Sequence, residues 1–157
     1  MKTRIAITIL LVVSFFFLPK YAYVSSSGIE HFLYPISHAN IFHLLVNILC
    51  LWMVRCPVNI LVTYTIAVIA SFLPAVSLYG LQEIPTMGFS GILFAMVGIT
   101  WGRVQRFKDM FIKNKWYLII PFFIPNINAF VHIYCLVLGF AYGYYSVYFS
   151  QSVWKRR

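Results

Sequence analysis

The stretch that decides the fold is residues 86–103, TMGFSGILFAMVGITWGR. It places one serine, Ser90, between Gly88 and Gly91 at the start of an apolar run that ends in basic residues. Small residues let membrane helices approach one another closely, so this helix is suited to more than anchoring the protein in the membrane. We expect it to hold a nucleophile close to neighbouring backbones. We therefore expect the remainder of the chain to surround, activate and shield Ser90.

The composition predicts a membrane protein. Of 157 residues, 62% are hydrophobic and 10% are charged, with a mean hydropathy of +0.85. A soluble domain of this length carries far more polar surface. Because about 20 apolar residues cross a bilayer, the chain has room for about six short helices. We predict an all-α integral membrane protein with a single six-transmembrane-helix domain over residues 1–157. Its predicted spans are about 5–18, 38–54, 58–79, 88–102, 116–125 and 128–150.

The net charge of +9 indicates topology, and not a nucleic-acid partner. With six spans, every Lys and Arg except Lys20 falls on one side, which the positive-inside rule makes cytoplasmic. Both termini are then cytoplasmic, with a basic loop over 103–115. The small size favours a bacterial cytoplasmic (inner) membrane, and an archaeal membrane stays open. Residues 5–18 after Lys2 and Arg4 also resemble a signal peptide, although the cleavage pattern that should follow is poor.

The three cysteines, Cys50, Cys56 and Cys135, are predicted to be small apolar packing residues without a disulfide.

Polar residues inside the predicted spans mark a candidate site. Buried polar groups in membrane helices usually face the bundle interior. His43 and Asn47 are four residues apart and share a helix face, and His38 lies nearer the loop. At about 1.5 Å per residue, Ser90 lies about 20 Å and His43 about 18 Å from the basic edge. The same calculation permits a contact between Ser90 and His132 without establishing it.

These residue types support one chemistry. A serine hydroxyl needs a base to take its proton, and histidine is the usual base. Attack on an amide builds an oxyanion, for which Asn47 and His43 are candidate donors. No carboxylate is expected nearby, so a hydrolase here would use a Ser–His dyad, with Phe94 stacked on the imidazole. Taken singly, each residue is also typical of simple helix packing. His38 and His43 lack a metal-binding pattern, so no metal or other cofactor is expected.

Together these motifs resemble the rhomboid intramembrane serine proteases. They are His38-x4-His43-x3-Asn47, Gly88-Phe89-Ser90-Gly91, and the last span, which reads Ala129-Phe130-Val131-His132 and continues to Gly139. The resemblance covers about residues 34–145. It implies that Ser90 is the nucleophile and His132 the general base, in a bundle whose fifth span gates the substrate. It also implies that Asn47, His43 and the Ser90 N–H form an oxyanion hole next to Gly88. The supporting residues would be His38, Phe94, Gly91 and Gly139.

Three departures from the family pattern are visible. The Trp-Arg motif usual in the first outer loop, here about 19–37, is absent. Phe94 stands where tyrosine is common, and Cys135 stands where a smaller residue is usual. None of them removes a catalytic group.

The sequence leaves three functions open. The first is an endopeptidase that cuts single-span or other membrane proteins within or just outside a transmembrane segment. The second is a catalytically silent rhomboid-like protein that binds membrane clients; the complete pair of Ser90 and His132 argues against it. The third is a small transporter or channel, which would predict an internal repeat, and no repeat is visible.

Overall fold

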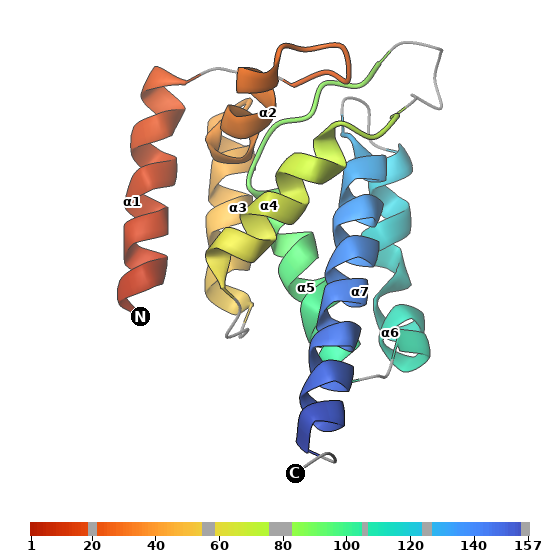
Figure 1. Ribbon diagram of the computed structural model, residues 1–157. Helices are drawn as coiled ribbons and strands as arrows, with labels where there is room; N and C mark the ends of the chain where they lie inside the picture. The colour runs from red at the N-terminus through yellow and green to blue at the C-terminus, as the bar shows by residue number, and fades with distance from the viewer. Residues whose placement is uncertain (19–21, 55–58, 76–82, 105–106, 124–126, 155–157) are drawn as a thin grey trace.

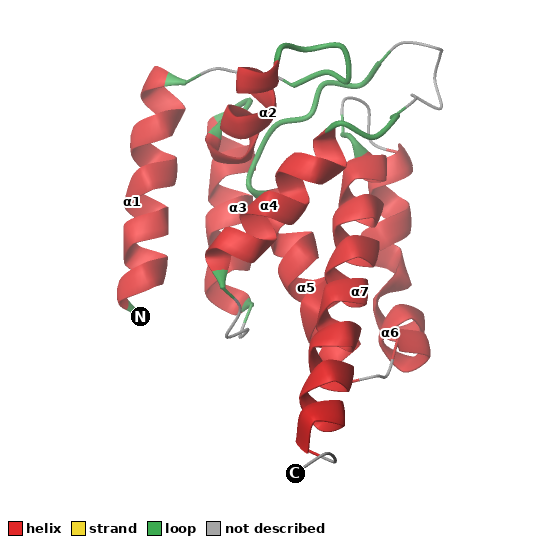
Figure 2. Ribbon diagram, viewed as in Figure 1, coloured by secondary structure: helices red, strands yellow, loops and turns green. Residues whose placement is uncertain are grey.

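The protein is a bundle of helices. The computed structural model describes residues 1–18, 22–54, 59–75, 83–104, 107–123 and 127–154, and within these ranges it contains no strand (Figure 2). The all-helical prediction is thus confirmed for this part of the chain. The helices are α1 Lys2–Phe17, α2 Gly28–Leu33, α3 Ile41–Met53, α4 Ile60–Ser71, α5 Ser90–Val104, α6 Phe107–Ile119 and α7 Ala129–Trp154, with 3-10 helices η1 Tyr34–Ile36 and η2 Ile120–Phe123.

The core of the bundle is the pair α5–α7, which has the most extensive contact of any two helices described here (Figure 1). Glycines on both helices make this approach possible. A Cβ atom added at Gly98 would lie 2.9 Å from the Phe140 nitrogen, and one added at Gly139 would lie 3.1 Å from the Ala95 Cα. Backbone meets backbone at both points, so the two helices are held at a fixed separation.

Helix α1 is attached by polar contacts from an otherwise apolar surface. The Arg4 guanidinium donates to the carbonyl oxygens of Trp52 (3.3 Å) and Val54 (2.6 Å), at the end of α3. A cation suits this position because the last carbonyls of a helix lack intrahelical partners. Near the other end of α1, the Ser14 hydroxyl donates to the Ile36 carbonyl at 2.6 Å. These hydrogen bonds fix α1 against α3 and η1.

The segment before α5 enters the bundle. Figure 1 shows residues 83–89 passing down from the end of the molecule that carries α2, so that α5 begins among the other helices and not at the surface. An isolated antiparallel bridge between Ala22 and Thr86 holds this segment to the connection after α1. The first residue of α5, Ser90, is therefore presented in the interior.

Two boundary predictions were wrong. The predicted basic loop 103–115 is largely helical, because α6 begins at Phe107. Hydropathy marks where a helix becomes apolar and not where it begins. The predicted span 58–79 continues past Pro74, but α4 ends at Ser71. Proline disfavours helical geometry in the residue before it, which makes it a stop signal here. Cys56 lies outside the described residues.

The length of the helices bears on the predicted membrane spans. Of the helices described, only Ala129–Phe149, with 21 residues, is long and apolar enough to cross a membrane by itself. Gly28–Ile36 and Ile41–Met53 pass the same test together, but they are bent by 72°. Ile60–Ser71 and Ser90–Val104 are apolar but shorter. The count of six spans therefore stays a prediction.

Candidate functional site

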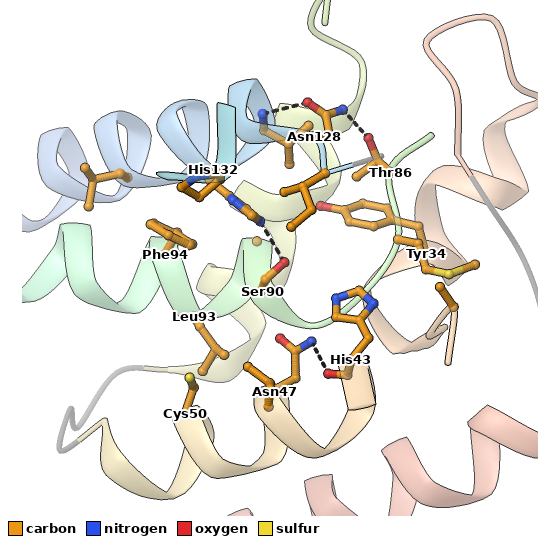
Figure 3. Close-up of a pocket in the computed structure, with 18 of the residues that line it drawn as sticks. Tyr34, His43, Asn47, Cys50, Thr86, Ser90, Leu93, Phe94, Asn128 and His132 are labelled. Carbon is orange, nitrogen blue, oxygen red and sulfur yellow. Dashed lines mark hydrogen bonds between the residues drawn. The ribbon is translucent and has the colours of Figure 1, made fainter. Parts of the chain in front are cut away.

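The centre of the candidate site is a hydrogen bond between α5 and α7. His132 Nε2 lies 2.8 Å from Ser90 Oγ (Figure 3). The Phe94 ring stacks on the imidazole, with ring centroids 4.4 Å apart and an interplanar angle of 11°. The other ring nitrogen, Nδ1, is buried and has no hydrogen-bond partner among the described residues. Stacking on Phe94 is therefore the contact that orients the ring.

The chain reaches Ser90 through a glycine that no other residue replaces easily. Gly88 has φ +105°, a conformation that L-residues rarely adopt. A Cβ atom there would also lie 2.6 Å from His43 Cε1 and 2.7 Å from His43 Nε2. The Gly88 N–H donates to the Tyr34 carbonyl at 2.9 Å, which fixes the turn against η1. The sequence predicted Gly88 beside His43 and Asn47, and the structure brings these residues together.

The opposite wall is the first turns of α3. The Asn40 side chain caps this helix by accepting the His43 N–H at 2.9 Å. Asn47 Nδ2 donates to the His43 carbonyl at 2.9 Å. A carboxamide has two N–H groups, so a second donor of Asn47 is left for another acceptor. His38 packs behind this wall, with its ring centroid 5.2 Å from that of His43.

Tyr34 supports the floor of the site from η1. Its side chain is 1% exposed, and its hydroxyl donates to the Ala67 carbonyl at 2.7 Å. Burial raises the pKa of Tyr34 well above its usual range, so the hydroxyl stays protonated and remains a donor. A Cβ atom at Gly91 would lie 3.1 Å from the Tyr34 hydroxyl and 3.4 Å from Cys135 Sγ. The unusual Cys135 thus packs beside Gly91, behind the serine.

These side chains face a cavity of about 1200 Å³. Six of the residues singled out in the sequence line it: His43, Asn47, Ser90, Gly91, Phe94 and His132. The other three, His38, Gly88 and Gly139, lie outside its lining. Away from Ser90 the cavity wall becomes mostly apolar and includes Val54, Trp101 and Leu118. Within the described ranges, no three His, Cys, Asp or Glu side chains are grouped so that they could hold a metal ion.

A second histidine–serine pair provides an internal comparison. His31 Nδ1 lies 2.8 Å from Ser71 Oγ, and Phe72 stacks on the His31 ring at 3.7 Å. The pair has the same parts as Ser90 and His132, but His31 is 0% and Ser71 2% exposed, and neither residue lines the cavity. The two pairs have the same hydrogen-bond length, and they differ in that only Ser90 and His132 face the cavity.

Sequence reasoning missed the residues that hold the rim of the site. Asn128, directly before α7, accepts the Val131 N–H at 3.2 Å and donates to Thr86 Oγ1 at 2.6 Å. Asparagine before an apolar helical run is a recognisable N-cap signal, so the first contact could have been found. The second joins residues far apart in the chain and has no sequence signal.

The fold and the site define a class of protein: an all-helical bundle with an apolar exterior and a histidine-bonded serine facing a cavity. A family model of the Rhomboid domain matches residues 25–149, and the chain belongs to the rhomboid family. Members of this family are integral membrane proteins that act on membrane proteins in the bilayer, and they are usually intramembrane serine proteases. No curated protein matched the chain. Helix α1 lies outside the matched residues.

Proposed function

We propose that this protein is an intramembrane serine endopeptidase. The observation that supports this most directly is the 2.8 Å contact between Ser90 Oγ and His132 Nε2 at the wall of a large cavity. Family membership supports the same reaction class. The alternative is a silent relative that only binds clients, but both members of the pair are present and hydrogen-bonded.

In this proposal His132 Nε2 takes the hydroxyl proton as Ser90 Oγ attacks a substrate carbonyl. The second N–H of Asn47, together with His43 and the Ser90 N–H, stabilises the resulting oxyanion. His132 then gives the proton to the leaving amine, and water hydrolyses the acyl-enzyme with the histidine again as base. Because no carboxylate of the described residues bonds Nδ1, stacking on Phe94 replaces the third member of a triad.

The proposed substrates are single-span or other membrane proteins, cut within or just outside a transmembrane segment. A substrate helix must unwind before its amide is exposed, and free backbone groups are costly in lipid. We therefore expect helix-weakening residues near the cut. The mostly apolar part of the cavity, away from Ser90, suits the membrane-embedded side of such a segment.

The proposed topology has six spans: α1, α3, α4, α5, α6 with η2, and α7. The beginning of α1 and the end of α7 both lie on the side of the bundle away from α2 in Figure 1, which fits an even number of crossings. The basic residues near these ends make that side cytoplasmic. The proposed location is a bacterial cytoplasmic membrane.

The test is serine-directed labelling and substrate cleavage in the same preparation. Wild-type protein in mild detergent is treated with a fluorophosphonate probe and, separately, with a single-span reporter substrate. Ser90→Ala and His132→Ala are compared with Ser71→Ala, which removes the serine of the buried pair. We expect labelling and cleavage to be lost in Ser90→Ala, cleavage to be lost in His132→Ala, and both to persist in Ser71→Ala.

Folded wild-type protein that is neither labelled nor able to cut in detergent or liposomes would refute the protease proposal. Labelling that survives Ser90→Ala and disappears in Ser71→Ala would show that Ser71, and not Ser90, is the reactive serine.

A further inference from the structure

Two parallel hydrogen bonds join the segment leading into α5 to the start of α7. Thr86 and Ser90 are four residues apart, and so are Asn128 and His132. Asn128 Nδ2 bonds to Thr86 Oγ1 at 2.6 Å, and His132 Nε2 bonds to Ser90 Oγ at 2.8 Å (Figure 3). The same Asn128 Nδ2 also lies 3.5 Å from the Ile84 carbonyl oxygen. The proposed catalytic bond thus runs beside the Asn128 contacts, between the same two segments.

The Thr86 end of the first cross-link is itself fixed. Thr86 exchanges two backbone hydrogen bonds with Ala22, at 2.7 and 3.0 Å. Two residues later the Gly88 N–H is bound to the Tyr34 carbonyl. Thr86 is 6% exposed, and its hydroxyl accepts the Asn128 hydrogen bond at the wall of the cavity. The segment is a fixed reference to which the start of α7 is tied.

The Asn128 end is rigidly coupled to α7. Asn128 is 8% exposed, and its Oδ1 accepts the Val131 N–H at 3.2 Å, as an N-cap does. One carboxamide thus orients the first turn of α7 and binds Thr86. His132 lies one helical turn further along the same helix. A change in the position of Asn128 would therefore also change the position of the His132 imidazole.

We propose that Asn128, acting through Thr86, is a positioning residue that sets the distance between His132 and Ser90. This inference rests on the proposed protease function. The close backbone contact between α5 and α7, at Ala95 and Gly139, lies further along both helices than the bond between Ser90 and His132. At the rim, the Asn128–Thr86 bond supplies the constraint that the glycines supply deeper in the bundle.

Substitutions can separate the two roles of Asn128. Asn128→Ser keeps an oxygen that caps α7 but is too short to reach Thr86. Thr86→Val removes the hydroxyl while preserving shape, and Thr86→Ser restores it. Tyr134→Phe is the matched control, because it removes another α7 hydrogen bond, from the Tyr134 hydroxyl to the Pro74 carbonyl at 2.8 Å, on a side that does not involve the serine segment.

The readouts are kcat and KM for the reporter substrate, the rate of fluorophosphonate labelling and the midpoint of thermal unfolding. We expect Asn128→Ser and Thr86→Val each to lower kcat and the labelling rate by about tenfold or more, with KM changed less than about twofold, because misplaced reacting groups lose rate and not binding. The double variant should be no slower than the worse single variant. Thr86→Ser and Tyr134→Phe should keep the wild-type rate.

Several results would overturn the inference. If wild type cleaves and both single variants keep its kcat, positioning by Asn128 is wrong and the protease proposal stands. A loss explained by thermal unfolding alone, or shared by Tyr134→Phe, would make the bond merely structural. Fully additive effects of Asn128→Ser and Thr86→Val would show that they do not act through one bond. Wild-type protein that neither labels nor cleaves removes the protease proposal and this inference together.

Discussion

Gly88→Ala should abolish most activity while leaving the protein folded. The added methyl group would lie 2.6 Å from His43 Cε1, and carbon atoms pack at about 3.5 Å or more. The His43 ring must then retreat by about 1 Å, which it can do by rotating, because it is the far end of a side chain. The φ of +105° adds about 1–3 kcal/mol of strain. A displacement of about 1 Å in a reacting constellation costs about a hundredfold in rate.

The assay compares kcat and thermal unfolding for wild type, Gly88→Ala and Gly28→Ala. Gly28 is the matched control, because a Cβ atom there meets nothing within 4 Å. The loss should be non-additive with His43→Ala, since both changes remove the same ring from the proposed oxyanion site. Full activity in Gly88→Ala would refute the geometric argument, and so would a loss of rate that only matches the loss of folded protein.

Three further predictions concern other parts of the structure. Asn47→Ala should lower kcat by about a hundredfold to a thousandfold by removing an oxyanion donor, as measured on the reporter; a change in KM alone would contradict that role. Gly139→Ala places a methyl group against the Ala95 backbone, which cannot rotate away, so the free energy of unfolding should fall by about 1–3 kcal/mol. If chemical denaturation gave Gly139→Ala the same free energy of unfolding as Gly28→Ala, close α5–α7 packing would be wrong. Arg4→Leu should cost about 1.5–3 kcal/mol of stability by leaving the last α3 carbonyls without a charged donor, and an unchanged unfolding midpoint would mean that water replaces the guanidinium.

The sequence was most informative where local spacing determines the answer. The four-residue interval of His43 and Asn47 puts them on one helix face, and counting from the basic edges gave similar depths for His43 and Ser90. The approach of His132 to Ser90 was permitted by that count but needed the structure, because it depends on how closely two distant helices pack. The glycines that set this separation were visible in the sequence, yet their partners were not.

Contacts between distant segments were beyond sequence reasoning. The Asn128–Thr86 bond depends on the path of the chain into the bundle, which no periodicity encodes. The helical start of α6 was missed because its lysines suppress hydropathy without suppressing helix formation. His31 and Ser71 were not considered as a pair, since one lies in a predicted loop and the other in a predicted apolar span.

The position at which α5 begins also has an electrostatic consequence. A helix carries about half a positive charge at its first turn, where N–H groups have no intrahelical partners. In most proteins water and salt screen this charge at the surface. Here the first residue is Ser90, inside the bundle and at the wall of a mostly apolar cavity, where screening is weak. The axis of α5 therefore directs a weakly screened field at the place where negative charge would develop, and the backbone itself supplies that field.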